Sequence, residues 1–174
     1  EIAFVLELAA DGQLLAITDT RQQQGKKLVG QSFRVPAGVK KTSGIAANLL
    51  WDNAEYVLGL PDAKKLEDNR SKGKEQDYLD RLLEMRAAFG ARITQLPKEL
   101  QAQPGVRAVR AFLNALDVAA LERFPALADI RTSNPILSFR LQGEVELICQ
   151  HPAIAAAAAA TSEDEDNLHA MCLI

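Results

Sequence analysis

The chain has 174 residues, of which 48% are hydrophobic and 25% are charged, and its net charge is −3. This length suits a single domain with a substantial core, and no apolar run approaches the roughly 20 residues that a membrane span requires. Two cysteines are too few for a disulfide framework, and no secretory leader is visible, so we expect a cytoplasmic protein without a membrane partner. Because the chain begins with Glu1 rather than Met and stops after the apolar residues 171–174, we expect a fragment of a longer protein.

Residues 1–60 have the pattern of a basic, β-rich part. Apolar side chains occupy every second position from residue 2 to residue 8, and the tight-turn pair Asp11-Gly12 separates them from apolar residues 14–17. This pattern predicts a β-hairpin.

The rest of this part alternates between turn-like and strand-like stretches. Residues 21–27 are polar and turn-like, and residues 32–35 predict a short strand before Pro36. Residues 37–44 predict a loop, and the aromatic residues 51–58 predict another strand.

Residues 61–134 predict a helical part. Residues 61–77 are charged with both signs, which is typical of a surface loop or a short solvated helix, and residues 78–93 place apolar side chains on one helical face. Pro104 suits the first turn of the next helix, which carries an apolar stripe over residues 106–116. Helical character continues over residues 118–130 with an interruption at Pro125.

Residues 135–174 predict a hairpin and an acidic tail. Residues 136–141 and 144–149 flank the turn pair Gln142-Gly143, residues 152–160 favour a helix, and residues 161–167 are acidic and expected to be mobile. Strands, helices and strands follow one another in that order, so we predict one α+β domain with antiparallel β-hairpins at both ends and a central helical segment.

Catalytic and metal-binding patterns are weak. Cys149 and His151 are two apart on an expected strand, but no glycine-rich elbow or orienting acid accompanies them. Adding His169 and Cys172 would supply four zinc ligands, although a one-residue gap is unusual for zinc. We interpret Glu144 and Glu146 as solvated carboxylates, and likewise the acidic residues 163–166, which lack the glycine and spacing of a calcium-binding loop. No phosphate-binding loop is present, because Gly25-Lys26-Lys27 lacks the upstream glycine. We therefore predict no catalytic residue, no metal and no cofactor.

A basic segment gives the stronger signal. Residues 21–51 contain no Asp or Glu and carry a charge of +6, which leaves −9 for the rest of the chain. Such asymmetry favours a local anionic partner, because Lys and Arg neutralise phosphates and release counterions. Residues 39–44 add hydroxyls and a glycine, Asn48 and residues 22–24 carry amides that can address base edges, and Trp51 and Tyr56 could stack on bases or fill the core.

The run KKTSGIAANLLWDNAEYVLG, residues 40–59, resembles the signature of the type I-C CRISPR Cascade large subunit. Gly-Lys-Lys-Leu at residues 25–28, Val-Pro at residues 35–36, Ser-Phe-Arg-Leu-Gln-Gly at residues 138–143 and Met-Cys-Leu-Ile at residues 171–174 resemble further stretches of that family in the same order. The chain is therefore similar to the N-terminal domain of a longer large subunit.

The resemblance implies a non-enzymatic DNA-binding domain that recognises the protospacer-adjacent motif on duplex DNA. Its implied partners are that duplex, the crRNA handle, other Cascade subunits and a recruited helicase-nuclease, while the guide RNA reads the target. The implied motif-reading residues are Lys40, Lys41, Thr42, Ser43, Gly44 and Asn48, and the implied phosphate or RNA-handle contacts are Arg21, Lys26, Lys27 and Arg34. Two alternatives stay open, namely a docking domain in the same complex that does not read DNA and a small hydrolase built on Cys149 and His151.

Overall fold

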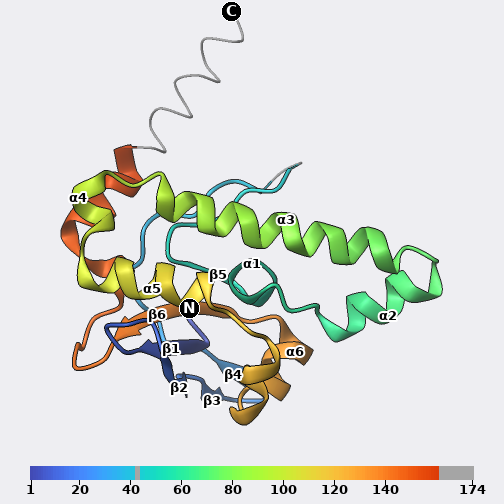
Figure 1. Ribbon diagram of the computed structural model, residues 1–174. Coiled ribbons are helices and arrows are strands. Elements are labelled where there is room, and N and C mark those ends of the chain that lie inside the picture. Colours follow the sequence, from blue (N-terminus) through green and yellow to red (C-terminus); the bar gives the residue numbers. More distant parts are fainter. Residues whose placement is uncertain (42–43, 161–174) are drawn as a thin grey trace, which may run out of the picture.

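The computed structural model describes residues 1–41 and 44–160 and shows a mixed β-sheet with helices packed against it (Figure 1). The sheet has four strands in the order β2-β1-β6-β5. The bounds of these strands are β1 (Phe4–Leu8), β2 (Leu14–Asp19), β5 (Trp51–Asn53) and β6 (Ile136–Leu141). Strands from both ends of the sequence thus meet in one sheet, and the predicted α+β class is confirmed.

The first two strands form the predicted hairpin. β1 and β2 pair antiparallel, with Phe4 opposite Asp19 and Leu8 opposite Leu14. Gly12 makes the turn possible, since it adopts a φ of 91° and only glycine reaches that region without strain. β1 also pairs in parallel with β6, so it lies in the interior of the sheet and its apolar side chains are almost completely buried.

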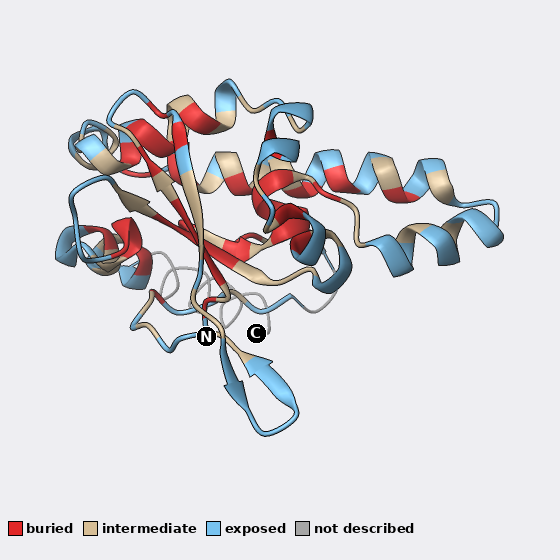
Figure 2. Ribbon diagram, turned by 90° about the horizontal axis from the view of Figure 1, so that it is seen from below, coloured by how far each residue is buried: buried red, intermediate tan, exposed pale blue. Residues whose placement is uncertain are grey.

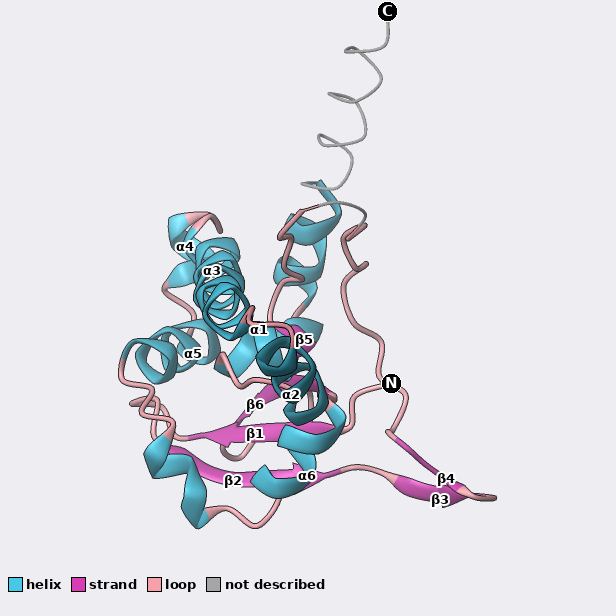
Figure 3. Cartoon of the chain, turned by 90° about the vertical axis from the view of Figure 1, so that its right-hand side faces the viewer, coloured by secondary structure: helices cyan, strands magenta, loops and turns pink. Residues whose placement is uncertain are grey.

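A second, smaller hairpin follows β2. β3 (Gln22–Gln24) pairs antiparallel with β4 (Lys27–Val29), and Gly25 at the turn has a φ of 61°. The polar stretch predicted to be turn-like therefore contains two short strands as well as a turn. Figures 2 and 3 show this hairpin projecting from the body of the molecule, and its residues are almost all exposed.

Helices cover the sheet and build the middle of the chain. They are α1 (Ala54–Leu58), α2 (Ala63–Ser71), α3 (Glu75–Thr94), α4 (Lys98–Gln101), α5 (Pro104–Asn114) and α6 (Leu127–Ser133), with 3-10 helices η1 (Ala119–Arg123) and η2 (Ile148–Gln150). Residues 152–160 are also helical. α5 contacts β1 and β6, and α3 packs on α5 and α1, so both lie on one side of the sheet (Figure 3). Among the described residues, none of the helices has the length and apolar character needed to cross a bilayer.

The core lies between the sheet and these helices. Phe139 of β6 is fully buried, and its ring centroid lies 6.2 Å from that of Phe89 in α3 and 6.0 Å from that of Phe112 in α5. The stripe predicted on α5 is confirmed, because Val106, Val109 and Phe112 are buried in this core.

Three predicted strands differ from the structure. Residues 32–35 form no strand, although Phe33 and Val35 pack against the core. Residues 51–58 form a strand only over β5, because the Asn53 side chain accepts the Tyr56 N–H and thereby caps helix α1. Residues 144–149 form no return strand after the turn at Gly143, because β1 and β5 already occupy both edges of β6.

Candidate nucleic-acid interface

The basic segment runs from the end of β2 to β5 and consists of the β3–β4 hairpin and the chain that follows it. Figure 3 shows the hairpin and the following chain along one side of the molecule. Four of its six cations are exposed and have no ion pair within the described part of the chain, namely Lys26, Lys27, Arg34 and Lys40. These four side chains are free to meet an anion.

Arg21 is engaged inside the protein. Its guanidinium lies 2.7 Å from the Asp19 carboxylate and 2.6 Å from the Asp129 carboxylate, and it stacks 4.4 Å from the centroid of the Phe4 ring. The hydrogen bonds to Asp19 hold the pKa of Arg21 above its usual range, and only 12% of the side chain is exposed. Arg21 therefore ties β2 to α6.

Residues 36–41, which we call the clasped segment, are held against β5 by hydrogen bonds. The indole Nε1 of Trp51 donates to the carbonyl of Pro36 at 3.1 Å, and the Val39 N–H donates to Asn48 Oδ1 at 2.9 Å. Gly38 lies close to both partners, since a Cβ there would be 3.3 Å from Asn48 Oδ1 and from a carbon of the Trp51 ring. Asn48 is 5% exposed, so its amide serves the fold of this segment.

Asp52 stabilises the far end of the clasped segment. This carboxylate is 1% exposed and accepts hydrogen bonds from Lys41 Nζ at 2.5 Å, the Asn48 N–H at 2.9 Å and the Asn53 N–H at 2.8 Å. The Lys41 ammonium also lies 3.8 Å from the centroid of the Tyr56 ring, an attractive cation–π contact. Lys41 therefore has internal partners, whereas its neighbour Lys40, which is also exposed, has no described ion pair.

The remaining residues predicted to read DNA are only partly placed. Gly44 is exposed, and a Cβ added there would meet no atom within 4 Å. Thr42 and Ser43 lie outside the described residues. Trp51 and Tyr56, which could have stacked on bases, instead hold the clasped segment: Trp51 is half-buried and the hydroxyl of Tyr56, 4% exposed, accepts the Ala46 N–H.

Sequence reasoning missed the role of Asp52. Its only signal was position, because Asp52 is the first acidic residue after the acid-free segment. An acid at that place is ambiguous in sequence, since a solvated carboxylate and a buried one that binds a lysine look alike.

No hydrogen bond joins Cys149 to His151 among the described residues. The thiol is buried 3.7 Å from Ser138 Oγ, and burial raises the pKa of Cys149 to about 11, whereas a nucleophilic cysteine needs a lowered pKa. The exposed His151 uses Nδ1 to accept the N–H of Ala153.

The four residues considered as a zinc site are only partly placed, since His169 and Cys172 lie outside the described residues. Within residues 1–41 and 44–160, no group of three or more His, Cys, Asp or Glu side chains could hold a metal ion.

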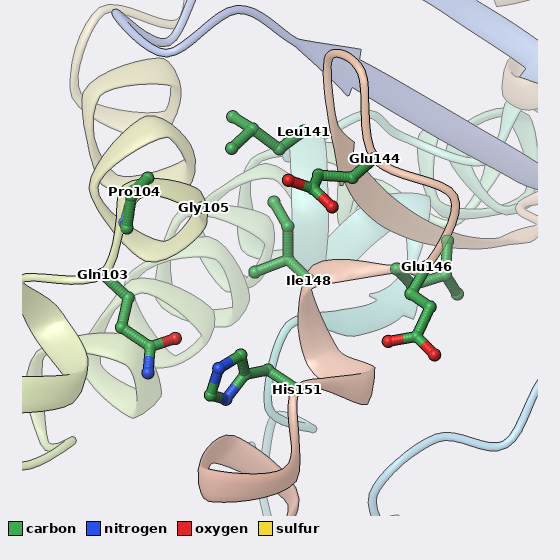
Figure 4. Close-up of a pocket in the computed structure, with 9 residues that line it drawn as sticks. Gln103, Pro104, Gly105, Leu141, Glu144, Glu146, Ile148 and His151 are labelled. Atoms are coloured by element: carbon green, nitrogen blue, oxygen red, sulfur yellow. The ribbon is translucent and has the colours of Figure 1, made fainter.

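A cavity of about 410 Å³ lies between the start of α5 and η2. Figure 4 shows Gln103 and His151 at one end of it and Leu141 and Glu144 at the other. Glu146 also lines this cavity, and Glu144 and Glu146 are exposed, as expected for solvated carboxylates. Its lining combines apolar side chains with separated polar groups, and no described hydrogen bond joins the histidine to either carboxylate.

The comparison with protein families agrees with the resemblance seen in the motifs. Residues 1–174 match the family described as CRISPR-associated protein (Cas_Csd1). Among the curated proteins, none matches this chain. Since the family match spans residues 1–174, the chain belongs to the Csd1 family of CRISPR-associated proteins, the large-subunit family of type I-C Cascade.

Proposed function

We propose that this chain binds duplex DNA in a type I-C Cascade complex and takes part in recognising the protospacer-adjacent motif, without catalysing a reaction itself. Family membership makes it a CRISPR-associated Cascade protein with other Cascade subunits as partners. Contact with the crRNA handle, recruitment of a helicase-nuclease and a cytoplasmic location belong to the same proposal.

The observation that carries the proposal is the set of unpaired cations on the basic segment. Lys26 and Lys27 lie on the projecting β3–β4 hairpin, and Arg34 and Lys40 lie on the chain that follows. Exposed cations without internal partners can neutralise phosphates, and each phosphate contact releases counterions. A two-stranded ribbon also has the dimensions to enter a major groove.

The docking alternative would use the apolar stripe of α5 as a partner-binding surface. The apolar stripe of α5 that could have received a partner is buried in the chain's own core. The exposed cations, in contrast, face solvent with no partner in the described chain, which favours an anionic ligand over an apolar one.

The test is duplex binding by the Cascade complex that contains this chain, measured across a salt titration with and without the protospacer-adjacent motif. Replacing Lys26, Lys27, Arg34 and Lys40 by Ala removes the four free cations. The plot of log Kd against log salt should lose about 0.9 of slope for each phosphate contact, or as much as about 3.6 for four.

A matched control removes the same charges elsewhere. Lys64, Lys74, Arg81 and Lys98 are also three lysines and one arginine, are exposed, and lie along the helical part. Their replacement by Ala should leave the salt slope within error of the unmodified complex. Equal losses of slope from both variants would mean that net charge rather than this surface binds DNA, and no loss from the first variant would favour the docking role.

A further inference from the structure

We propose that Asp52 is a positioning residue for DNA binding, which acts by engaging Lys41 in an internal ion pair and by holding the clasped segment so that Lys40 faces solvent without a partner. This inference deepens the proposed function and rests on it. It assigns unlike roles to two adjacent lysines that sequence alone treats as equivalent.

The first step is the chemistry of a buried acid. Asp52 is 1% exposed, and a buried carboxylate is strongly unfavourable unless donors satisfy it. The structure supplies three donors, namely the Lys41 ammonium and the backbone N–H groups of Asn48 and Asn53. The lysine is the only one of the three that brings a positive charge.

The second step concerns Lys41. Its ammonium is held between the Asp52 carboxylate and the face of the Tyr56 ring, and 30% of the side chain stays exposed. A phosphate would have to compete with both partners to bind this group. Lys40 carries the same charge, is exposed and has no described ion pair, so it contacts phosphate at a lower cost.

The third step links Asp52 to the backbone of the clasped segment. Asp52 Oδ2 accepts the Asn48 N–H at 2.9 Å, and Asn48 Oδ1 accepts the Val39 N–H at 2.9 Å, next to Lys40. Two hydrogen bonds in series therefore run from the acid to the residue before the exposed lysine. Loss of the carboxylate charge loosens this series and releases Lys41 at the same time.

The test compares four single variants in the Cascade complex by two readouts, the hydrogen exchange of the Val39 and Asn48 amides and the salt dependence of duplex binding. Asp52→Asn keeps the shape and one acceptor oxygen but removes the charge. This variant should raise both exchange rates at least about tenfold and raise the Kd for duplex DNA about tenfold. The salt slope should not fall, because the substitution removes no cation that contacts phosphate.

The three lysine variants separate positioning from charge. Lys40→Ala should lower the salt slope by about 0.9 and leave both exchange rates unchanged. Lys41→Ala should raise the exchange rates and leave the slope unchanged, and Lys41→Arg, which keeps a cation beside Asp52, should restore slow exchange. Lys41→Ala and Lys41→Arg also carry the test if Asp52→Asn fails to fold.

Two results would overturn the inference. One is fast exchange in Asp52→Asn with unchanged DNA affinity, which would leave Asp52 a purely structural role. The other is a slope loss in Lys41→Ala equal to that in Lys40→Ala, which would make both lysines phosphate contacts. Failure of the proposed function looks different, because the variant lacking all four free cations would then keep its full salt slope.

Discussion

Tyr78→Phe tests the polar network that joins four helices behind the sheet. The Tyr78 hydroxyl donates to Glu55 Oε1 at 2.6 Å and accepts the Asp62 N–H at 3.0 Å. Glu55 is 3% exposed and also accepts hydrogen bonds from Lys65 and Asn134, each at 2.8 Å. The substitution removes one oxygen and leaves the ring in place, so it isolates the hydroxyl.

The expected loss follows from the charge of the acceptor. A hydrogen bond to an ionised group contributes about 1.5–3 kcal/mol, so Tyr78→Phe should lower the free energy of unfolding by that amount at about pH 7. For a domain of this size, such a loss corresponds to a fall in Tm of about 3–12 °C.

The loss should also depend on pH, with a sign that the structure determines. Burial, and then the hydrogen bond to Glu55, raise the pKa of Tyr78 above its ordinary value of about 10. In the unfolded chain the phenol loses its proton at about pH 10, while the folded protein keeps it. The stabilisation is therefore complete below about pH 10 and falls by about 1.4 kcal/mol per pH unit above it.

The assay is urea unfolding of the unmodified and Tyr78→Phe proteins at about pH 7 and about pH 11, since comparison at each pH cancels the titration of other groups. The difference between the two proteins should narrow at the higher pH. Tyr56→Phe is the matched control, because its hydroxyl accepts one backbone N–H at 3.3 Å and should contribute only about 0.5–1.5 kcal/mol. A Tyr78→Phe loss no larger than this control, or one that is constant with pH, would refute the reasoning.

Two further predictions concern the turns and the buried thiol. Gly12→Ala should cost about 2–5 kcal/mol by urea unfolding, because the strain of a φ of 91°, about 1–2 kcal/mol, adds to the overpacking of a Cβ that would lie 2.6 Å from Ala111 Cβ. Gly25→Ala should cost only about 1–2 kcal/mol, since its Cβ would meet no atom within 4 Å, and equal costs would contradict the steric argument. In a Cys172→Ser background, Cys149 should react with a disulfide reagent at about pH 8 far more slowly in the folded protein than in the protein unfolded by urea. The reason is that burial raises the pKa of Cys149 to about 11. Equal rates in the two states would show that the folded protein has an accessible thiolate.

The sequence predicted the parts of the fold that depend on local pattern. Alternation and the Asp11-Gly12 turn located the first hairpin, and Pro104 with its apolar stripe located α5, because these signals lie within a few neighbouring residues. The strand expected over residues 144–149 failed for a non-local reason. β6 pairs with β1 and β5, more than 80 residues away along the chain, and no local pattern reports that both of its edges are taken.

The candidate site was predictable as a region but not as a set of contacts. The absence of acids from residues 21–51 marked a segment in which four exposed cations have no ion pair among the described residues. The partners of each cation depended on residues far along the chain. Arg21 meets Asp129 after 108 positions, which sequence order cannot reveal.

The charge that this segment offers to DNA is smaller than the charge that it carries. Of its six cations, Arg21 is shared by two carboxylates and Lys41 by a carboxylate and an aromatic ring, so four remain for phosphates. If all six cations contacted phosphates, they would contribute about 5.4 to the slope of log Kd against log salt, and four would contribute about 3.6. The slope that is lost when the six are replaced by Ala therefore counts the cations that contact phosphate. A loss near the larger figure would mean that DNA draws Arg21 and Lys41 away from their internal partners. The cost of leaving the buried Asp52 carboxylate without Lys41, and of separating Arg21 from two carboxylates, makes the smaller figure the expected one.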